Sequence, residues 1–138
     1  MSHFQREALR ARYKATSKTN LGAIFDDVHP EFELKTADRV PGAGTYRGAE
    51  AATRFFADLV APFEQVTYEP QRFFERGDRI VVFLIVRFKP QGSDAVVENQ
   101  VGALWTIRDG KPIRCEMFPQ REQALEAAGM TEQDLRSG

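Results

Sequence analysis

The chain has 138 residues, of which 42% are hydrophobic and 28% are charged, and its formal net charge is −1. These values are typical of one globular domain, which we expect to span residues 1–138. The sequence contains no basic run, so we expect neither nucleic acid nor a membrane as a partner. The longest apolar run, residues 80–86, is far shorter than the ~20 residues that cross a bilayer.

The few cysteine and histidine residues limit the disulfides and metal sites that the chain can form. The one cysteine, Cys115, rules out an internal disulfide and favours a reducing, cytoplasmic setting. Residues 2–13 carry charges throughout and lack the apolar stretch of a signal peptide. His3 and His29 together with Cys115 do not form a recognisable metal-binding pattern, and no phosphate-binding glycine loop is present. We therefore expect no metal and no cofactor.

Apolar residues spaced three and four positions apart predict helices. The predicted helices cover about residues 2–18, 21–28, 49–60 and 122–128. The second helix should end at His29-Pro30, because the residue before a proline avoids helical dihedral angles. Gly129 should end the last helix, since glycine adopts the left-handed conformation without a steric penalty.

Alternating or continuous apolar residues predict strands. The predicted strands cover residues 31–36, 66–75, 79–89, 97–108 and 111–118. Pro70 has no amide hydrogen, so its strand should be an edge strand or contain a bulge. Helices followed by consecutive strands predict an α+β domain, in which three N-terminal and central helices wrap a cone-shaped, curved antiparallel β-sheet. The mouth of such a cone is the natural place for a pocket.

The last two predicted strands form a hairpin around Asp109-Gly110, a pair that accommodates positive φ at both loop positions. A regular two-residue loop would place Leu104 opposite Cys115 and Trp105 opposite Arg114. The face toward the helices and the pocket would then hold Gly102, Leu104, Thr106, Ile113, Cys115 and Met117. Trp105 and Arg114 would point away from the helices. If the two faces were exchanged, Arg114 and Glu116 would become a charged pair in the pocket.

Five segments resemble the nuclear transport factor 2-like superfamily, in its SnoaL-like polyketide-cyclase and ketosteroid-isomerase branch. They are IFDDVHPEFE (24–33), YRGAEA (46–51), GDRIV (77–81), RDGK (108–111) and REQALEAAG (121–129). The resemblance covers nearly the whole chain and implies a cone-shaped α+β fold, a homodimer and an apolar pocket. It does not imply one reaction, because the superfamily includes isomerases, cyclases, dehydratases, epoxide hydrolases and proteins without known catalysis.

The resemblance also implies positions for catalytic groups. Ketosteroid isomerases use a tyrosine on the first helix and a protonated aspartate on the hairpin as hydrogen-bond donors, with a second aspartate as the base. Tyr13 matches the tyrosine, whereas the base position falls at Thr36 and the hairpin position at Leu104. Met117 stands where related epoxide hydrolases carry a carboxylate. One of the three isomerase groups is thus present, and the base is missing.

Pattern and resemblance together predict a ligand pocket. Its predicted lining is Tyr13, Phe25, Thr36, Phe56, Gln100, Leu104, Cys115 and Met117. Tyr13 is a candidate to orient a ligand carbonyl, or it is a flanking tyrosine with its hydroxyl at the surface or on a backbone carbonyl. His29 is a candidate general base, or it is only a helix stop. Cys115 is a candidate nucleophile, or it is a small buried apolar residue.

These features favour a protein that binds a small apolar molecule of the polyketide, terpenoid or aromatic kind, without defining its reaction. The alternatives are an isomerase or lyase acting on a small hydrophobic carbonyl compound, and a purely structural module. Trp105, Arg114 and Phe118, on the face away from the helices, would form an apolar patch of the kind found at homodimer interfaces. The alternative for this face is a solvated surface with Trp105 under the stem of Arg114.

Overall fold

A computed structural model describes residues 2–17, 20–38 and 40–131, with side chains from residue 6 onward. The helices are α1 (Ser2–Ala15), the short 3-10 helix η1 (Leu21–Phe25), α2 (Ala49–Val60) and α3 (Arg121–Ala128). The strands are β1 (Glu33–Lys35), β2 (Thr45–Arg47), β3 (Phe63–Arg76), β4 (Arg79–Pro90), β5 (Val97–Arg108) and β6 (Lys111–Phe118). The predicted α+β class is confirmed. No helix in the described ranges is long and apolar enough to span a membrane.

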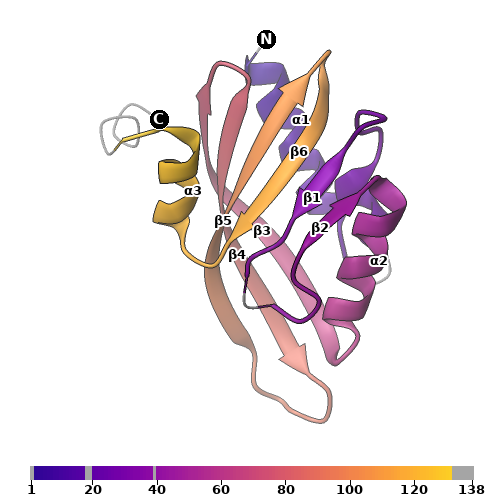
Figure 1. The fold of residues 1–138 in the computed structure, drawn as a ribbon. Coiled ribbons are helices and arrows are strands. Elements are labelled where there is room, and N and C mark those ends of the chain that lie inside the picture. The colour runs from indigo at the N-terminus through magenta and orange to yellow at the C-terminus, as the bar shows by residue number, and fades with distance from the viewer. Residues whose placement is uncertain (1, 18–19, 39, 132–138) are drawn as a thin grey trace.

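The strands form one curved, unclosed sheet in the order β2-β1-β6-β5-β4-β3 (Figure 1). All neighbours are antiparallel except β1 and β6, which run parallel. Strand β2 lies within residues 37–48, where the sequence predicts neither a helix nor a strand, and it pairs with β1 through Leu34 and Tyr46. Pro70 lies in the edge strand β3 beside a bulge, which matches the expectation for a strand that lacks one amide donor.

Helices cover both faces of this sheet. The inner face packs against α1, η1 and α2 in a core that includes Leu9, Phe25 and Phe55. The outer face packs against α3, which buries Leu104 together with Ala124 and forms a smaller second core. In Figure 1 the yellow α3 accordingly lies away from α1 and α2. The sequence predicts helices on one face only, so the position of α3 is a difference from the expected architecture.

The turn of the β5–β6 hairpin is as predicted, with φ of 54° at Asp109 and 76° at Gly110. Beyond it the predicted register is wrong, because a bulge at Ile113 adds one residue to β6. Trp105 therefore lies opposite Cys115 rather than Arg114. Because neighbouring side chains alternate between faces, this one-residue shift places Trp105 on the same face as Cys115.

Candidate functional site

A cavity of about 540 Å³ lies between the inner face of the sheet and the helices. Aliphatic and aromatic side chains supply most of its wall, among them Phe25, Phe56, Leu84 and Met117. Among the described residues, no Asp, Glu, His, Lys or Arg lines it. The polar atoms of the wall come from tyrosine, tryptophan, threonine, cysteine and amide side chains. This is the composition of a site that accepts a neutral, apolar molecule.

Two aromatic side chains are hydrogen-bonded to each other in this wall. The indole Nε1–H of Trp105 donates to the Tyr13 hydroxyl oxygen at 2.8 Å, and the two rings meet edge to face. Both residues are buried, Trp105 completely. Burial raises the pKa of Tyr13 well above its ordinary value, so its hydroxyl stays protonated at physiological pH. Tyr13 is therefore a hydrogen-bond donor in this site and not a base.

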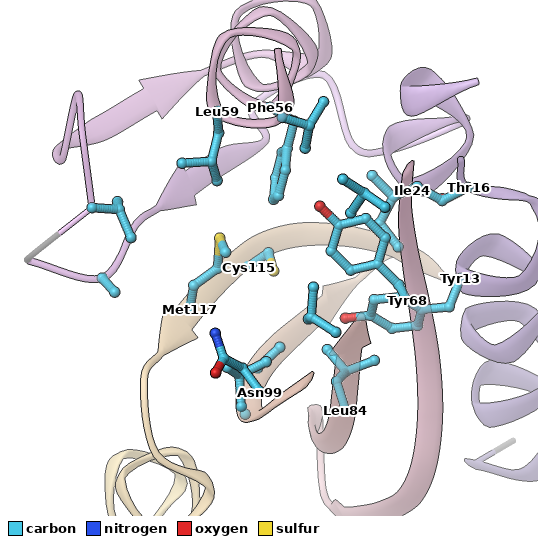
Figure 2. A pocket seen from close by; sticks show the side chains of 18 of the residues that line it. Tyr13, Thr16, Ile24, Phe56, Leu59, Tyr68, Leu84, Asn99, Cys115 and Met117 are labelled. Atoms are coloured by element: carbon cyan, nitrogen blue, oxygen red, sulfur yellow. The ribbon is translucent and has the colours of Figure 1, made fainter. Parts of the chain in front are cut away.

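A second tyrosine, Tyr68 of β3, lines the same cavity. Its ring contacts that of Phe56 edge to face. Burial raises the pKa of Tyr68 to about 12, so this hydroxyl is also neutral at physiological pH. Figure 2 shows the hydroxyls of Tyr13 and Tyr68 both pointing into the cavity.

Strand β5 supplies an amide near the exposed end of the cavity. Asn99 pairs with Val86, whose side chain also lines the cavity, and Figure 2 shows Asn99 on this wall. Gln100 is also part of the lining, but it pairs with Ile85 on the alternate face of β4. Both amides are exposed. The inward amide is therefore Asn99, whereas the sequence predicts Gln100.

The sulfur-containing side chains of β6, Cys115 and Met117, line the cavity beside each other in Figure 2. Cys115 is buried, and this burial raises the pKa of its thiol well above the ordinary value. A nucleophilic cysteine needs a lowered pKa, because the thiolate is the reactive form. Cys115 is therefore a packing residue of the wall.

The structure brings six of the eight predicted pocket residues together in this lining. They are Tyr13, Phe25, Phe56, Gln100, Cys115 and Met117. The other two, Thr36 and Leu104, do not line it, and their prediction is corrected. The Thr36 hydroxyl accepts from the Gly44 amide at 2.8 Å and donates to the Ala37 carbonyl, which ties down the loop after β1. Leu104 points to α3 because of the bulge in the hairpin.

His29 lies outside the cavity, at the turn of the β5–β6 hairpin. Its amide donates to the Pro112 carbonyl at 2.8 Å, and its Nδ1 accepts from the Glu31 amide at 3.0 Å. Its Nε2 is 3.7 Å from an oxygen of Asp109. These contacts fix the hairpin against the segment before β1. His29 is thus not placed to act as a general base at the mouth of the pocket.

The residues predicted for a dimer interface separate in the structure. Trp105 is fully buried inside its own chain, so it cannot lie in an interface, and this part of the prediction is corrected. Arg114 stays on the outer face, where it pairs with Glu116 at 3.3 Å. Phe118 is half-buried between the cavity and the α3 core.

Sequence reasoning missed Tyr68, Asn99 and Trp105 as cavity residues. The signal for Tyr68 was strand alternation, because Val66 and Tyr68 share a face on β3 and Val66 is buried. The signal for Trp105 was its size, since a large aromatic residue in a central strand is more easily buried than exposed. Within the described residues, no group of three or more His, Cys, Asp or Glu side chains is placed to hold a metal.

Comparison with known proteins agrees with this architecture. The SnoaL-like domain family matches residues 9–114, and the chain belongs to that family. No curated protein matches the chain.

Three solved structures illustrate the likeness. TerC, co-crystallised with polyporic acid, is 26% identical, with a TM-score of 0.71 over 82% of this chain and 88% of TerC. A candidate SnoaL-like polyketide cyclase from Jannaschia sp. is 18% identical, with a TM-score of 0.64 over 85% of this chain and 83% of the other. A protein of ketosteroid isomerase-like fold from Catenulispora acidiphila, in complex with trimethylamine, is 15% identical, with a TM-score of 0.66 over 91% of this chain and 92% of the other.

Proposed function

We propose that this protein binds a small, neutral, largely apolar molecule in the cavity between the sheet and α1, η1 and α2. The observation that carries the proposal is the lining itself, which is apolar over most of its area and contains no charged side chain among the described residues. The volume of about 540 Å³ lies within the range of small-molecule sites. Compact polyketide, terpenoid or aromatic compounds fit this chemistry. The complex of TerC with polyporic acid supports a small-molecule role for a related fold.

Thermal unfolding in the presence of a panel of apolar ketones tests this proposal. A ligand at one hundred times its Kd should add about 2.7 kcal/mol to the free energy of unfolding. The matched pair of variants is Val101→Trp, which fills the cavity from β5, and Thr106→Trp, on the opposite face of the same strand. Stabilisation should be lost in the first and kept in the second. No stabilisation of the wild type by any compound at millimolar concentration would remove the support for a binding role.

A second candidate is an isomerase or lyase that acts on a hydrophobic carbonyl compound. The observation that favours it is the Trp105–Tyr13 hydrogen bond, which leaves the Tyr13 proton available to a substrate oxygen. The described lining supplies no carboxylate or histidine as a base, so a water held by Asn99 would have to move the proton. On any substrate that is turned over, Tyr13→Phe should reduce kcat about 100-fold. Unchanged turnover in a folded variant would exclude this role for Tyr13.

A homodimer remains a separate proposal, now based on the charged outer face. This face carries two ion pairs, Arg47–Glu33 at 3.1 Å and Arg114–Glu116 at 3.3 Å. A two-fold interface brings a patch against its own copy, so a patch that holds both signs of charge is complementary to itself.

A cytoplasmic location is likewise proposed, supported by a single cysteine that is buried as a free thiol. Fractionation of cells that express the protein tests the location.

A further inference from the structure

The direction of the hydrogen bond between Trp105 and Tyr13 determines what Tyr13 can offer a ligand. An indole N–H is a donor and never an acceptor, so the Tyr13 oxygen must be the acceptor at 2.8 Å. The Tyr13 proton then needs another acceptor, and the described residues provide none within hydrogen-bond distance. Accepting one hydrogen bond also polarises the Tyr13 O–H, which strengthens it as a donor.

Tyr68 presents a second hydroxyl with the same need. Its ring is packed against Phe56, and the described part of the chain offers no hydrogen-bond partner for its hydroxyl. Figure 2 shows this hydroxyl directed into the same cavity as that of Tyr13. After burial and the Cys115 thiol, Tyr68 is a further cause of the raised pKa of Tyr13. Tyr68 is partly buried, so its donor is left to water or to a bound molecule inside the cavity, and a ligand that cannot accept from it leaves it unpaired.

We propose that Tyr13 and Tyr68 both donate hydrogen bonds to one bound molecule, so that the cavity selects neutral carbonyl compounds over hydrocarbons of the same shape. The inference rests on the proposed binding function and specifies its ligand class. A ketone or quinone oxygen is a pure acceptor with two lone pairs, which matches two neutral donors. A carboxylate would need a cation, and an ammonium group would need an anion, and the described lining offers neither.

The test compares 9-fluorenone with fluorene, two rigid tricyclic molecules that differ only at the carbonyl carbon. Binding of each is measured by calorimetry or by competition with a fluorescent apolar dye. The wild type should bind fluorenone at least about tenfold more tightly than fluorene, since an unsatisfied donor pair penalises the hydrocarbon. Tyr68→Phe should reduce this preference about tenfold or abolish it, while leaving the affinity for fluorene unchanged or raised.

The chain supplies its own control in its third tyrosine. The Tyr46 hydroxyl donates to the Gly42 carbonyl, and Tyr46 does not line the cavity. Tyr46→Phe should therefore keep the wild-type preference for fluorenone. The carbonyl stretching frequency of bound fluorenone provides a second readout. It should be lowered by the two donors in the wild type and should rise in Tyr68→Phe and in Tyr13→Phe, whereas a purely structural role would leave it unchanged.

The outcomes separate the two proposals. If neither fluorenone nor fluorene binds, the binding function itself loses support. If both bind with equal affinity, or if Tyr68→Phe keeps the preference and the carbonyl frequency of the wild type, the two-donor site is overturned and the binding function stands. If only Tyr13→Phe alters the preference, Tyr68 is not a ligand contact and the inference is likewise overturned.

Discussion

Tyr68 shows how burial of one side chain connects ligand binding to folding stability. Its hydroxyl faces the cavity, and its pKa is raised from 10 to about 12 because the surrounding wall disfavours the charged tyrosinate. The fold therefore prefers the neutral hydroxyl. A group whose pKa is raised on folding stabilises the folded state below its unfolded pKa, and this contribution is lost as the pH rises through the folded value.

We accordingly expect an alkaline loss of stability that Tyr68→Phe reduces. The contribution of Tyr68 is fully present below pH 10 and disappears as the pH approaches 12, which corresponds to at most about 3 kcal/mol. Urea unfolding of wild type and variant at pH 10 and pH 12 measures the difference. The wild type should lose more stability than Tyr68→Phe over this interval, with Tyr13 and Cys115 still contributing in both. Equal losses in the two proteins would contradict a raised pKa of Tyr68 in the folded state.

At the scale of elements, the contact between α3 and β5 depends on one glycine. A Cβ at Gly102 would lie 2.9 Å from the Cβ of Ala124 and 3.1 Å from the Cα of Arg121. Both distances are shorter than ordinary carbon contacts, which are about 3.5–4.0 Å. The glycine is thus required for the close approach of the helix to the strand, and with it for the second core on the outer face.

Gly102→Ala should therefore destabilise the protein by about 1–3 kcal/mol, because the added methyl pushes α3 away from β5. Chemical denaturation measures the loss, and hydrogen exchange should show faster opening of α3. The double variant Gly102→Ala with Ala124→Gly removes the nearest clash and should recover part of the loss relative to additivity. If the free-energy changes of the two single variants simply add in the double variant, the side chains at these positions do not clash.

For the whole molecule, the outer face decides whether two copies associate. If the dimer forms through the charged face, Glu116→Arg should yield a monomer, since it leaves Arg114 without its partner and concentrates like charges. Glu50→Arg, on α2 and away from this face, is the matched control and should leave the dimer intact. Sedimentation velocity at micromolar concentrations distinguishes these outcomes. A wild-type protein that sediments as a monomer under those conditions would rule the proposal out.

The sequence alone determined the class of fold, most elements and part of the cavity. Helix α2 spans 49–60 as predicted, because its apolar residues repeat at helical spacing and Gly48 and Pro62 flank it. The Asp109-Gly110 turn was also predictable, since its positive φ angles are a local property of those two residues. Local chemistry of this kind does not depend on distant parts of the chain.

The tertiary structure decided which side chains meet in the cavity. A single extra residue at Ile113 exchanged the faces of β5 relative to β6, so that Trp105 enters the core and Leu104 meets α3. Alternation transmits that local bulge along the whole strand. Pro112, which lacks an amide hydrogen and directly precedes Ile113, is a sequence signal for the bulge that the predicted register did not include. The Trp105–Tyr13 hydrogen bond joins residues 92 positions apart in the chain. Only packing of α1 against the curved sheet brings them together, because sequence pattern fixes the face of an element but not its partner.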